Sequence, residues 1–206
     1  EINRNFRNEG ISTQHNPEFT MLEFYQAYAN YHDLMDLTEE LIKFVAMEVN
    51  GKLTTHFNDV EIDLNKWRRF SMREAIIEFW PEEAGAKPSM QDFASDASTL
   101  ALVEHLRTAH RQIDFKPGEP HGKTIATIFE TVAEEHLIQP TIIYDFPLAV
   151  SPLSKQKLDE PDWVERFEFY IGGFELGNAF SELNDPEEQR KRFEQQLAER
   201  ERGDEE

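Results

Sequence analysis

The sequence contains no cysteine. That absence excludes a disulfide-stabilised scaffold and a metal centre built on thiolates. The sequence also lacks an apolar run long enough to cross a bilayer, so neither a membrane span nor a membrane partner is expected. Residues 1–4 do not resemble a signal peptide and are typical of the start of a strand. The absence of cysteine also fits a reducing compartment, so we expect a cytoplasmic location.

Positive charge is scarce. The chain has 21 Lys and Arg against 41 Asp and Glu, which gives a formal net charge of -20. Because proteins grip phosphate backbones with Lys and Arg, this chain is not expected to supply the main contact surface for a nucleic acid. Much of the acidic excess lies in short runs and at the C-terminal end, and solvated acidic faces explain it.

Glycine-rich phosphate loops are absent as well, which argues against a P-loop or Rossmann nucleotide site. What is present, 206 residues with 39% hydrophobic content, suffices for one sizeable core. Apolar spacing and capping residues predict helices over 32–50, 71–80, within 89–110, around 125–132 and from 185 onward. Strands are expected at 2–8, 18–28, 53–57, 60–64, 141–146 and on both sides of Gly172-Gly173. This order predicts an α+β domain, an antiparallel sheet flanked by helices.

The opening segment alternates. Phe19, Met21, Glu23 and Tyr25 fall on one face of the expected strand, so a carboxylate stands in an apolar and aromatic row. A buried carboxylate is costly unless a cation or hydrogen-bond donors meet it. The alternative is an edge strand whose Glu23 faces water, and alternation alone leaves both interpretations open.

A second pattern lies in residues 166–184. A two-residue turn at Gly172-Gly173 would place Tyr170 opposite Glu175 and Glu168 opposite Gly177. Glu168 and Glu175 would then be diagonal neighbours, about 7–8 Å apart between backbones. Two carboxylates this close favour a shared cation such as Mg²⁺, although a solvated polar face is the alternative. A bulge near Gly177 is expected to bring the row that follows into phase with Glu175. That row comprises Asn178, Phe180 and Glu182.

Two stretches carry a family resemblance. FRNEG followed by HNPEFTMLEFYQAY resembles the second signature motif of class II aminoacyl-tRNA synthetases, and the lysyl-tRNA synthetases in particular. GGFELGNAFSELND resembles the segment between motifs 2 and 3 of that family, with Ala179 where the pattern more often has glycine, a methyl expected to bear on the pocket wall. Residues 139–147 and 150–153 also match. The resemblance implies that residues 1–206 are part of a synthetase catalytic domain, with its antiparallel sheet incomplete and a helical insertion at about 82–122.

The resemblance also implies roles for individual residues. Arg7 would be the catalytic arginine that contacts the ATP α-phosphate and the lysine carboxylate. ATP would be bound by Arg7, Glu9, His15, Asn16 and Phe19, the last stacking on adenine. Lysine would be bound by Glu23, Tyr25, Asn178, Phe180 and Glu182. Mg²⁺ would be held on the phosphates by Glu168 and Glu175.

The resemblance sets the expected partners and also the alternatives. Motif 1, the anticodon-binding barrel and motif 3 of the family are not found in these residues. We therefore expect an interior part of a longer homodimeric synthetase, which contacts tRNA(Lys) mainly through other segments and shows little activity as 206 residues alone. The alternatives are a lysyltransferase paralogue that modifies a protein, and a non-catalytic synthetase-like fragment.

Overall fold

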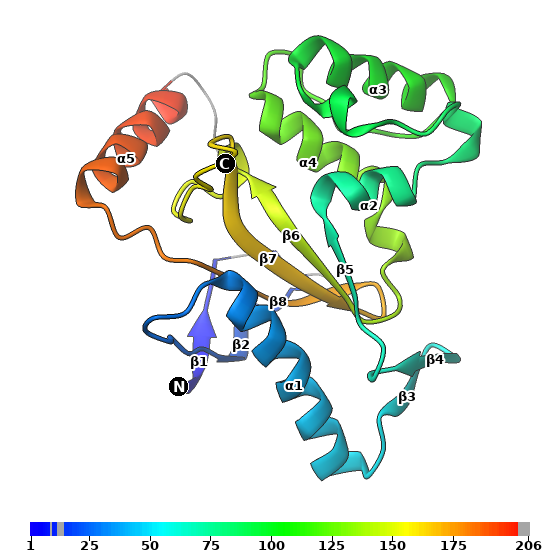
Figure 1. The fold of residues 1–206 in the computed structure, drawn as a ribbon, viewed down its shortest axis with the longest axis vertical. Helices are drawn as coiled ribbons and strands as arrows, with labels where there is room; N and C mark the ends of the chain where they lie inside the picture. Colours follow the sequence, from blue (N-terminus) through cyan, green and yellow to red (C-terminus); the bar gives the residue numbers. More distant parts are fainter. Residues whose placement is uncertain (9, 12–14, 202–206) are drawn as a thin grey trace.

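The computed structural model describes residues 1–8, 10–11 and 15–201, without the side chains of 199–201. At its centre is a four-stranded sheet in the order β5-β6-β7-β8 (Figure 1). Its strands are β5 (Arg68–Ser71), β6 (Thr141–Pro147), β7 (Trp163–Ile171) and β8 (Phe174–Phe180). The last three pair antiparallel, but β5 pairs parallel with β6. The expected wholly antiparallel sheet is therefore wrong at that pair, because a long helical connection returns the chain to the same end of the sheet.

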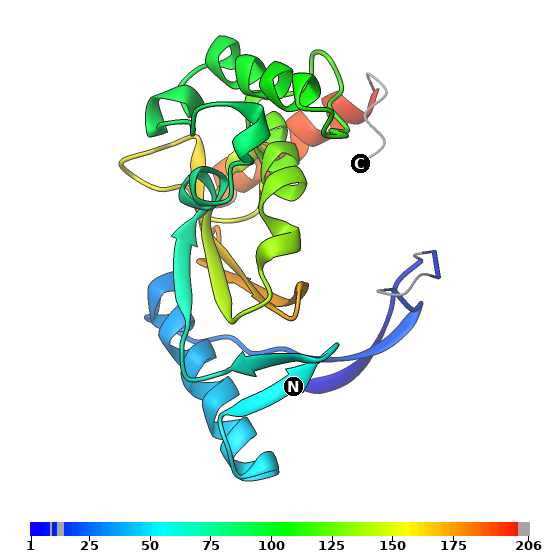
Figure 2. The same cartoon turned by 90° about the vertical axis from the view of Figure 1, so that its right-hand side faces the viewer.

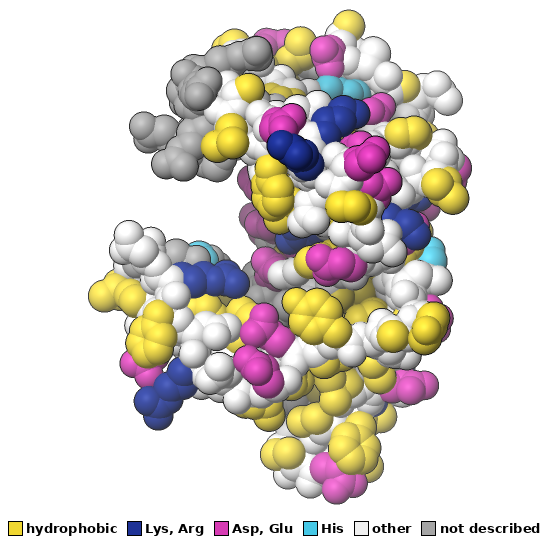
Figure 3. All heavy atoms as spheres, turned by 90° about the vertical axis from the view of Figure 1, so that its left-hand side faces the viewer, with side chains coloured by type: hydrophobic (Ala, Val, Ile, Leu, Met, Phe, Trp, Pro, Cys, Tyr) yellow, Lys and Arg dark blue, Asp and Glu magenta, His cyan; other side chains and the backbone are white. Residues whose placement is uncertain are grey.

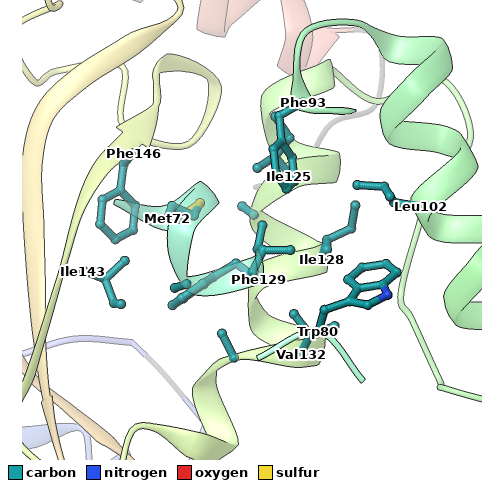
Figure 4. Packing of buried hydrophobic residues seen from close by; sticks show 14 of the residues in the cluster. Met72, Trp80, Phe93, Leu102, Ile125, Ile128, Phe129, Val132, Ile143 and Phe146 are labelled. Carbon is teal, nitrogen blue, oxygen red and sulfur yellow. The ribbon is translucent and has the colours of Figure 1, made fainter. Parts of the chain in front are cut away.

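Helices cover both faces of this sheet. On one face, α1 (Tyr31–Asn50) packs Tyr31 and Met35 against Ile142 and Phe167. On the other face lie α2 (Met72–Glu78), α3 (Asp96–Thr108) and α4 (His121–Val132). Figure 4 shows the core on this second face, where Phe129 lies between α4 and the sheet. Each helix therefore buries an apolar stripe, as the sequence periodicity predicts.

The predicted helical segment at 82–122 packs into that same core. It contains the short 3₁₀ turns η1 (Glu82–Ala84) and η2 (Met90–Phe93), followed by α3. Phe93 and Leu102 belong to one buried cluster with Val164 of the sheet. Two more 3₁₀ turns, η3 (Glu134–His136) and η4 (Leu148–Val150), flank β6. The description of 82–122 as an insertion stays a prediction.

Capping residues set the helix boundaries. The side chain of Asn30 accepts hydrogen bonds from the amides of His32 and Asp33 at the start of α1, and Gly51 ends this helix with a left-handed φ of 67°. The predicted capping box at Ser71 and Glu74 is present at α2. That helix ends at Glu78, two residues earlier than predicted.

Two hairpins stand outside the central sheet. β3 (Thr54–Phe57) and β4 (Val60–Asp63) pair around Asn58-Asp59, where both residues have the positive φ that such a turn requires. β1 (Ile2–Phe6) pairs with β2 (Glu18–Leu22), and Figure 2 shows this hairpin projecting from the body of the molecule. The strand predicted over 18–28 is thus too long. β2 ends at Leu22, and the Glu23 amide donates one further bond to the carbonyl oxygen of Glu1.

The last helix, α5 (Pro186–Glu201), follows β8. Arg192 attaches it to the loop before β7 by donating hydrogen bonds of 2.7 Å to the carbonyl oxygens of Pro152 and Ser154. No helix in the described part of the chain is long and apolar enough to cross a membrane.

Candidate active site

One face of the β7–β8 hairpin carries three of the predicted site residues, Glu168, Glu175 and Asn178. Pairing places Glu168 opposite Asn178 and Tyr170 opposite Glu175. Residues that face each other across an antiparallel ladder share a side of the sheet, so these four side chains form one group. Arg166 and Phe180 extend it by one pair. This is the face that α2 and α4 cover farther along the sheet, where Val164 and Tyr170 join their core.

A β-bulge in β8 places Glu175 and Asn178 on the same face of the sheet. The register shifts between Phe169 and Tyr170, because Gly177 pairs with Phe169 while Glu175 pairs with Tyr170, which leaves Leu176 as the extra residue. The predicted pairing of Glu168 with Gly177 is therefore wrong by one residue. The expected bulge near Gly177 is confirmed, and Glu175 and Asn178 now share a face, with 3.4 Å between the Asn178 Nδ2 and Glu175 Oε1 atoms.

Glu168 is a buried carboxylate whose two oxygens are both engaged. Arg166 donates to one oxygen at 2.5 Å and the Tyr170 hydroxyl donates to the other at 2.7 Å. Burial raises the pKa of Glu168, the charge of Glu175 raises it further, and Arg166 opposes both effects. The predicted pair is thus electrostatically coupled, with one buried and one exposed member.

Sequence reasoning missed a third carboxylate in this group. Glu134, in the turn after α4, lies 3.4 Å from the hydroxyl of Tyr170, which also donates to Glu168. Burial raises the pKa of Glu134 to about 7, and the negative charges of Glu130 and Glu168 add to the shift. The Glu134-Glu135 run suggested a solvated acidic face, and the sequence holds no signal that separates Glu134 from its exposed neighbour.

The β1–β2 hairpin holds the predicted ATP-binding residues apart from this group. The guanidinium of Arg7 lies over the ring of Phe19, 5.4 Å from its centroid. The Arg7 amide donates to the carbonyl oxygen of Pro17, which continues the ladder beyond Phe6. His15 and Asn16 are exposed. Glu9 lies outside the described residues.

The predicted lysine-binding residues fall into two segments. Asn178 and Phe180 lie on the face that Glu168 shares, and exposed Glu182 follows them in a bridge to Ser154. Glu23 and Tyr25 come after β2, and Tyr25 is 89% exposed. The expected single row from Phe19 to Tyr25 is confirmed only up to Met21, because the strand ends at Leu22.

A partly buried polar network links the start of α1, β6, the loop before β7 and α2. The Tyr31 hydroxyl donates to Asp145 at 2.8 Å, and the ammonium of Lys157 binds the other oxygen of the same carboxylate. Lys157 also pairs with Glu160, which Arg73 holds through two bonds of 2.8 Å. Asp145 sits where β6 departs from regular pairing, with a φ of 58°. No spacing in the sequence indicates this network, since its members come from separate elements.

A cavity in the described part of the chain lies elsewhere. It encloses about 1360 Å³ between the start of α4, η4 and α5, and no predicted site residue lines it. Glu130, whose charge acts on Glu134, lies at its wall. The molecule is also hollowed where the hairpin of β1 and β2 stands off from the sheet (Figure 3). Among the described residues, Glu168 is buried and Phe19 is half-buried, whereas the other predicted site residues are exposed.

Comparison with known proteins identifies the family of this chain. The profile of the class II tRNA synthetases (D, K and N) matches residues 1–206. The chain belongs to this family. Over 207 residues it is 49% identical to a lysine–tRNA ligase of Moorella thermoacetica and 46% identical to one of Histophilus somni. Both alignments cover 100% of this chain, which spans about 40% of the length of these relatives.

The structure tests the expectation for Ala179, which stands where the family pattern more often has glycine. The methyl group was expected to bear on the wall of the amino-acid pocket. Ala179 instead pairs with Phe167 and packs against the α1 cluster, on the sheet face opposite to Phe180. The added methyl is therefore taken up by the back of the sheet, and that expectation is wrong.

The synthetase family also implies Mg²⁺, and the residues present fit it. In the described part of the chain, no three His, Asp or Glu side chains gather into a set that would hold a metal alone. Mg²⁺ prefers one or two carboxylates together with substrate phosphates, so a complete protein cage is not required. The charge of Glu175 helps to raise the pKa of Glu168, and a divalent cation held beside both carboxylates would oppose that effect.

Proposed function

We propose that this chain is part of a lysine–tRNA ligase, which activates lysine with ATP to lysyl-adenylate and transfers the lysyl group to tRNA(Lys). The relatives that bear this activity in their names align over the whole chain at 44–49% identity. The observation that carries the proposal is the sheet face on which Glu168, Glu175 and Asn178 converge. The proposal includes a cytoplasmic location and a homodimer of the complete enzyme.

In this proposal, Arg7 contacts the ATP α-phosphate and the lysine carboxylate, so that positive charge meets the charge that develops during in-line attack. Phe19 stacks on adenine, and Glu9, His15 and Asn16 contact ATP from the loop between β1 and β2. The lysine carboxylate itself attacks and pyrophosphate leaves, so no protein nucleophile is needed. Catalysis then consists of positioning and electrostatic stabilisation.

Glu168 and Glu175 would hold Mg²⁺, which when bound neutralises phosphate charge. Arg166 and Tyr170 fix the carboxylate of Glu168 through its two oxygens, so its orientation is set before any ligand arrives. Glu175 lies on the exposed side of the pair and is free to adapt to a ligand. This division between a fixed and an adaptable carboxylate suits a cation that arrives together with ATP.

Lysine brings a compact ammonium with three donors and a long apolar stem. Glu23 and Glu182 would meet the ammonium, Tyr25 would add an acceptor, Asn178 would line the pocket, and Phe180 would flank the stem. All of them are exposed in the described chain, so a bound lysine would desolvate them.

Substitution of the acidic pocket residue tests the proposal. In the protein made from its complete coding sequence, Glu182→Gln should lower kcat/KM for lysine by orders of magnitude, because truncating one partner of a desolvated ion pair costs roughly 2–5 kcal/mol. The KM for ATP should change little. Exposed Glu187 at the start of α5 gives the matched control, Glu187→Gln. Normal lysine activation by Glu182→Gln would contradict the lysine assignment, and only the family membership would then stand.

The alternative acceptor is a protein instead of tRNA. The SELND wording at 181–185 and the motif 2 residues favour the tRNA enzyme. Lysylation assays with tRNA(Lys) and with candidate acceptor proteins separate the two. With a net charge of -20, these 206 residues are not expected to grip tRNA by themselves.

A further inference from the structure

The start of α1 is fastened to the end of β8. The amide of Tyr31 donates to the hydroxyl of Ser181 at 3.1 Å, across 150 residues of sequence. Both residues are buried. The first amides of a helix have no partner within the helix and must be satisfied from outside. Asn30 accepts from the next two amides, so Ser181 completes the cap at the position that Asn30 does not serve.

Each partner of this contact is itself held rigidly. The ring of Tyr31 packs with Met35, Ile142 and Phe167, and its hydroxyl donates to buried Asp145. The Ser181 amide donates to the carbonyl oxygen of Glu165, and the Ser181 carbonyl oxygen accepts from the Lys155 amide. The bond between the Ser181 hydroxyl and the Tyr31 amide therefore links two segments, the start of α1 and the end of β8, that other contacts already hold in place.

Each of these two segments is continuous with one half of the proposed lysine pocket. Ser181 lies between Phe180 and Glu182 and points to the opposite face of the sheet, toward α1. Tyr31 directly follows the segment 23–30, which starts with Glu23 and includes Tyr25. A shift of Ser181 relative to the amide of Tyr31 would thus change the separation between carboxylates that must meet one ammonium.

We infer that Ser181 is a positioning residue for amino-acid recognition, which sets the distance between the 23–25 segment and the Phe180–Glu182 segment through its bond to the Tyr31 amide. The inference rests on the proposed function, since it takes both segments to bind one amino acid. Ser181 itself touches no substrate in this arrangement. Its loss should therefore affect amino-acid recognition and spare the direct contacts to ATP, which lie within the β1–β2 hairpin, as well as the proposed Mg²⁺ pair, which lies within the β7–β8 hairpin.

The test is Ser181→Ala in the protein made from its complete coding sequence, assayed by amino-acid-dependent ATP–pyrophosphate exchange. We expect the KM for lysine to rise fivefold or more and the preference for lysine over ornithine to fall, while the KM for ATP stays within twofold. Ser181→Thr keeps the hydroxyl and should retain the preference for lysine. Ser95→Ala is the matched control, because Ser95 caps α3 through its hydroxyl at a place remote from both segments.

The outcomes separate the inference from the proposed function. An unchanged lysine KM in folded Ser181→Ala, or equal rises in the KM for lysine and for ATP, would overturn the positioning role while lysine activation by the wild type still stood. If the wild type activated a different amino acid, the lysine assignment would fail, and the inference would then require the KM for that amino acid to rise in Ser181→Ala. If the wild type activated none, the proposed function would fail and the inference with it.

Discussion

At the scale of single residues, the site depends on carboxylates in unequal environments. Glu168 is buried between an arginine and a tyrosine, Glu175 lies open on the facing strand, and Glu134 reaches the same tyrosine from the turn after α4. Residue type alone does not distinguish them. Their environments set which one keeps its proton near neutral pH and which one is free for a ligand.

The proposed metal pair gives a prediction. In the protein made from its complete coding sequence, Glu175→Gln should raise the Mg²⁺ concentration needed for half-maximal ATP-dependent activation, because one ligand oxygen loses its charge. Binding of free lysine should change less. The measurement is a Mg²⁺ titration of pyrophosphate exchange, with Glu187→Gln as the control. An unchanged Mg²⁺ requirement would return Glu168 and Glu175 to the solvated-face interpretation.

The raised pKa of Glu134 gives a second prediction, on stability. A carboxyl group whose pKa in the folded protein is about 7, against an ordinary value of 4.5, stabilises the fold fully below pH 4.5. This contribution is lost as the pH rises through 7. Glu134→Gln is neutral at every pH, so its Tm should gain on that of the wild type between pH 5 and pH 8. Glu135→Gln, at the exposed neighbour, should show no such gain in a pH series of thermal unfolding.

At the scale of elements, the sequence predicts what is local and misses what is distant. The ends of α1 follow from Asn30 and Gly51, and the β7–β8 hairpin follows from Gly172-Gly173. The parallel pairing of β5 with β6 depends on where three helices return the chain, which no single segment specifies. The link from Tyr31 to Asp145 and the approach of Glu134 to Tyr170 likewise join elements far apart in sequence.

The capping box of α2 gives a prediction at this scale. Ser71 accepts from the Glu74 amide, and its own amide donates to the Glu74 carboxylate at 2.7 Å. Ser71→Ala should lower the free energy of unfolding by about 1 kcal/mol, since that is the usual contribution of an N-cap side chain. Ser89→Ala should cost less, because exposed Ser89 caps only the four-residue turn η2. Denaturant unfolding of the three proteins measures this, and equal losses would show that burial of the Ser71 box adds nothing.

At the scale of the whole molecule, the central sheet with helices on both faces holds the β7–β8 face rigid, while the β1–β2 hairpin carrying Arg7 stands apart from it (Figure 2). A reaction that needs both groups must bring ATP and lysine between them. The chain spans about 40% of the length of its lysine–tRNA ligase relatives. We therefore expect the 206 residues alone to show little or no activation, and the complete coding sequence to supply it.

The most direct measurement is amino-acid-dependent ATP–pyrophosphate exchange by the protein made from its complete coding sequence, run with lysine, aspartate, asparagine and β-lysine in parallel. These four separate the branches of the D, K and N family and the protein-modifying paralogue. The account predicts exchange with α-lysine well above the other three, followed by lysyl transfer to tRNA(Lys). Preference for aspartate, asparagine or β-lysine, or no exchange with any of them, would contradict it.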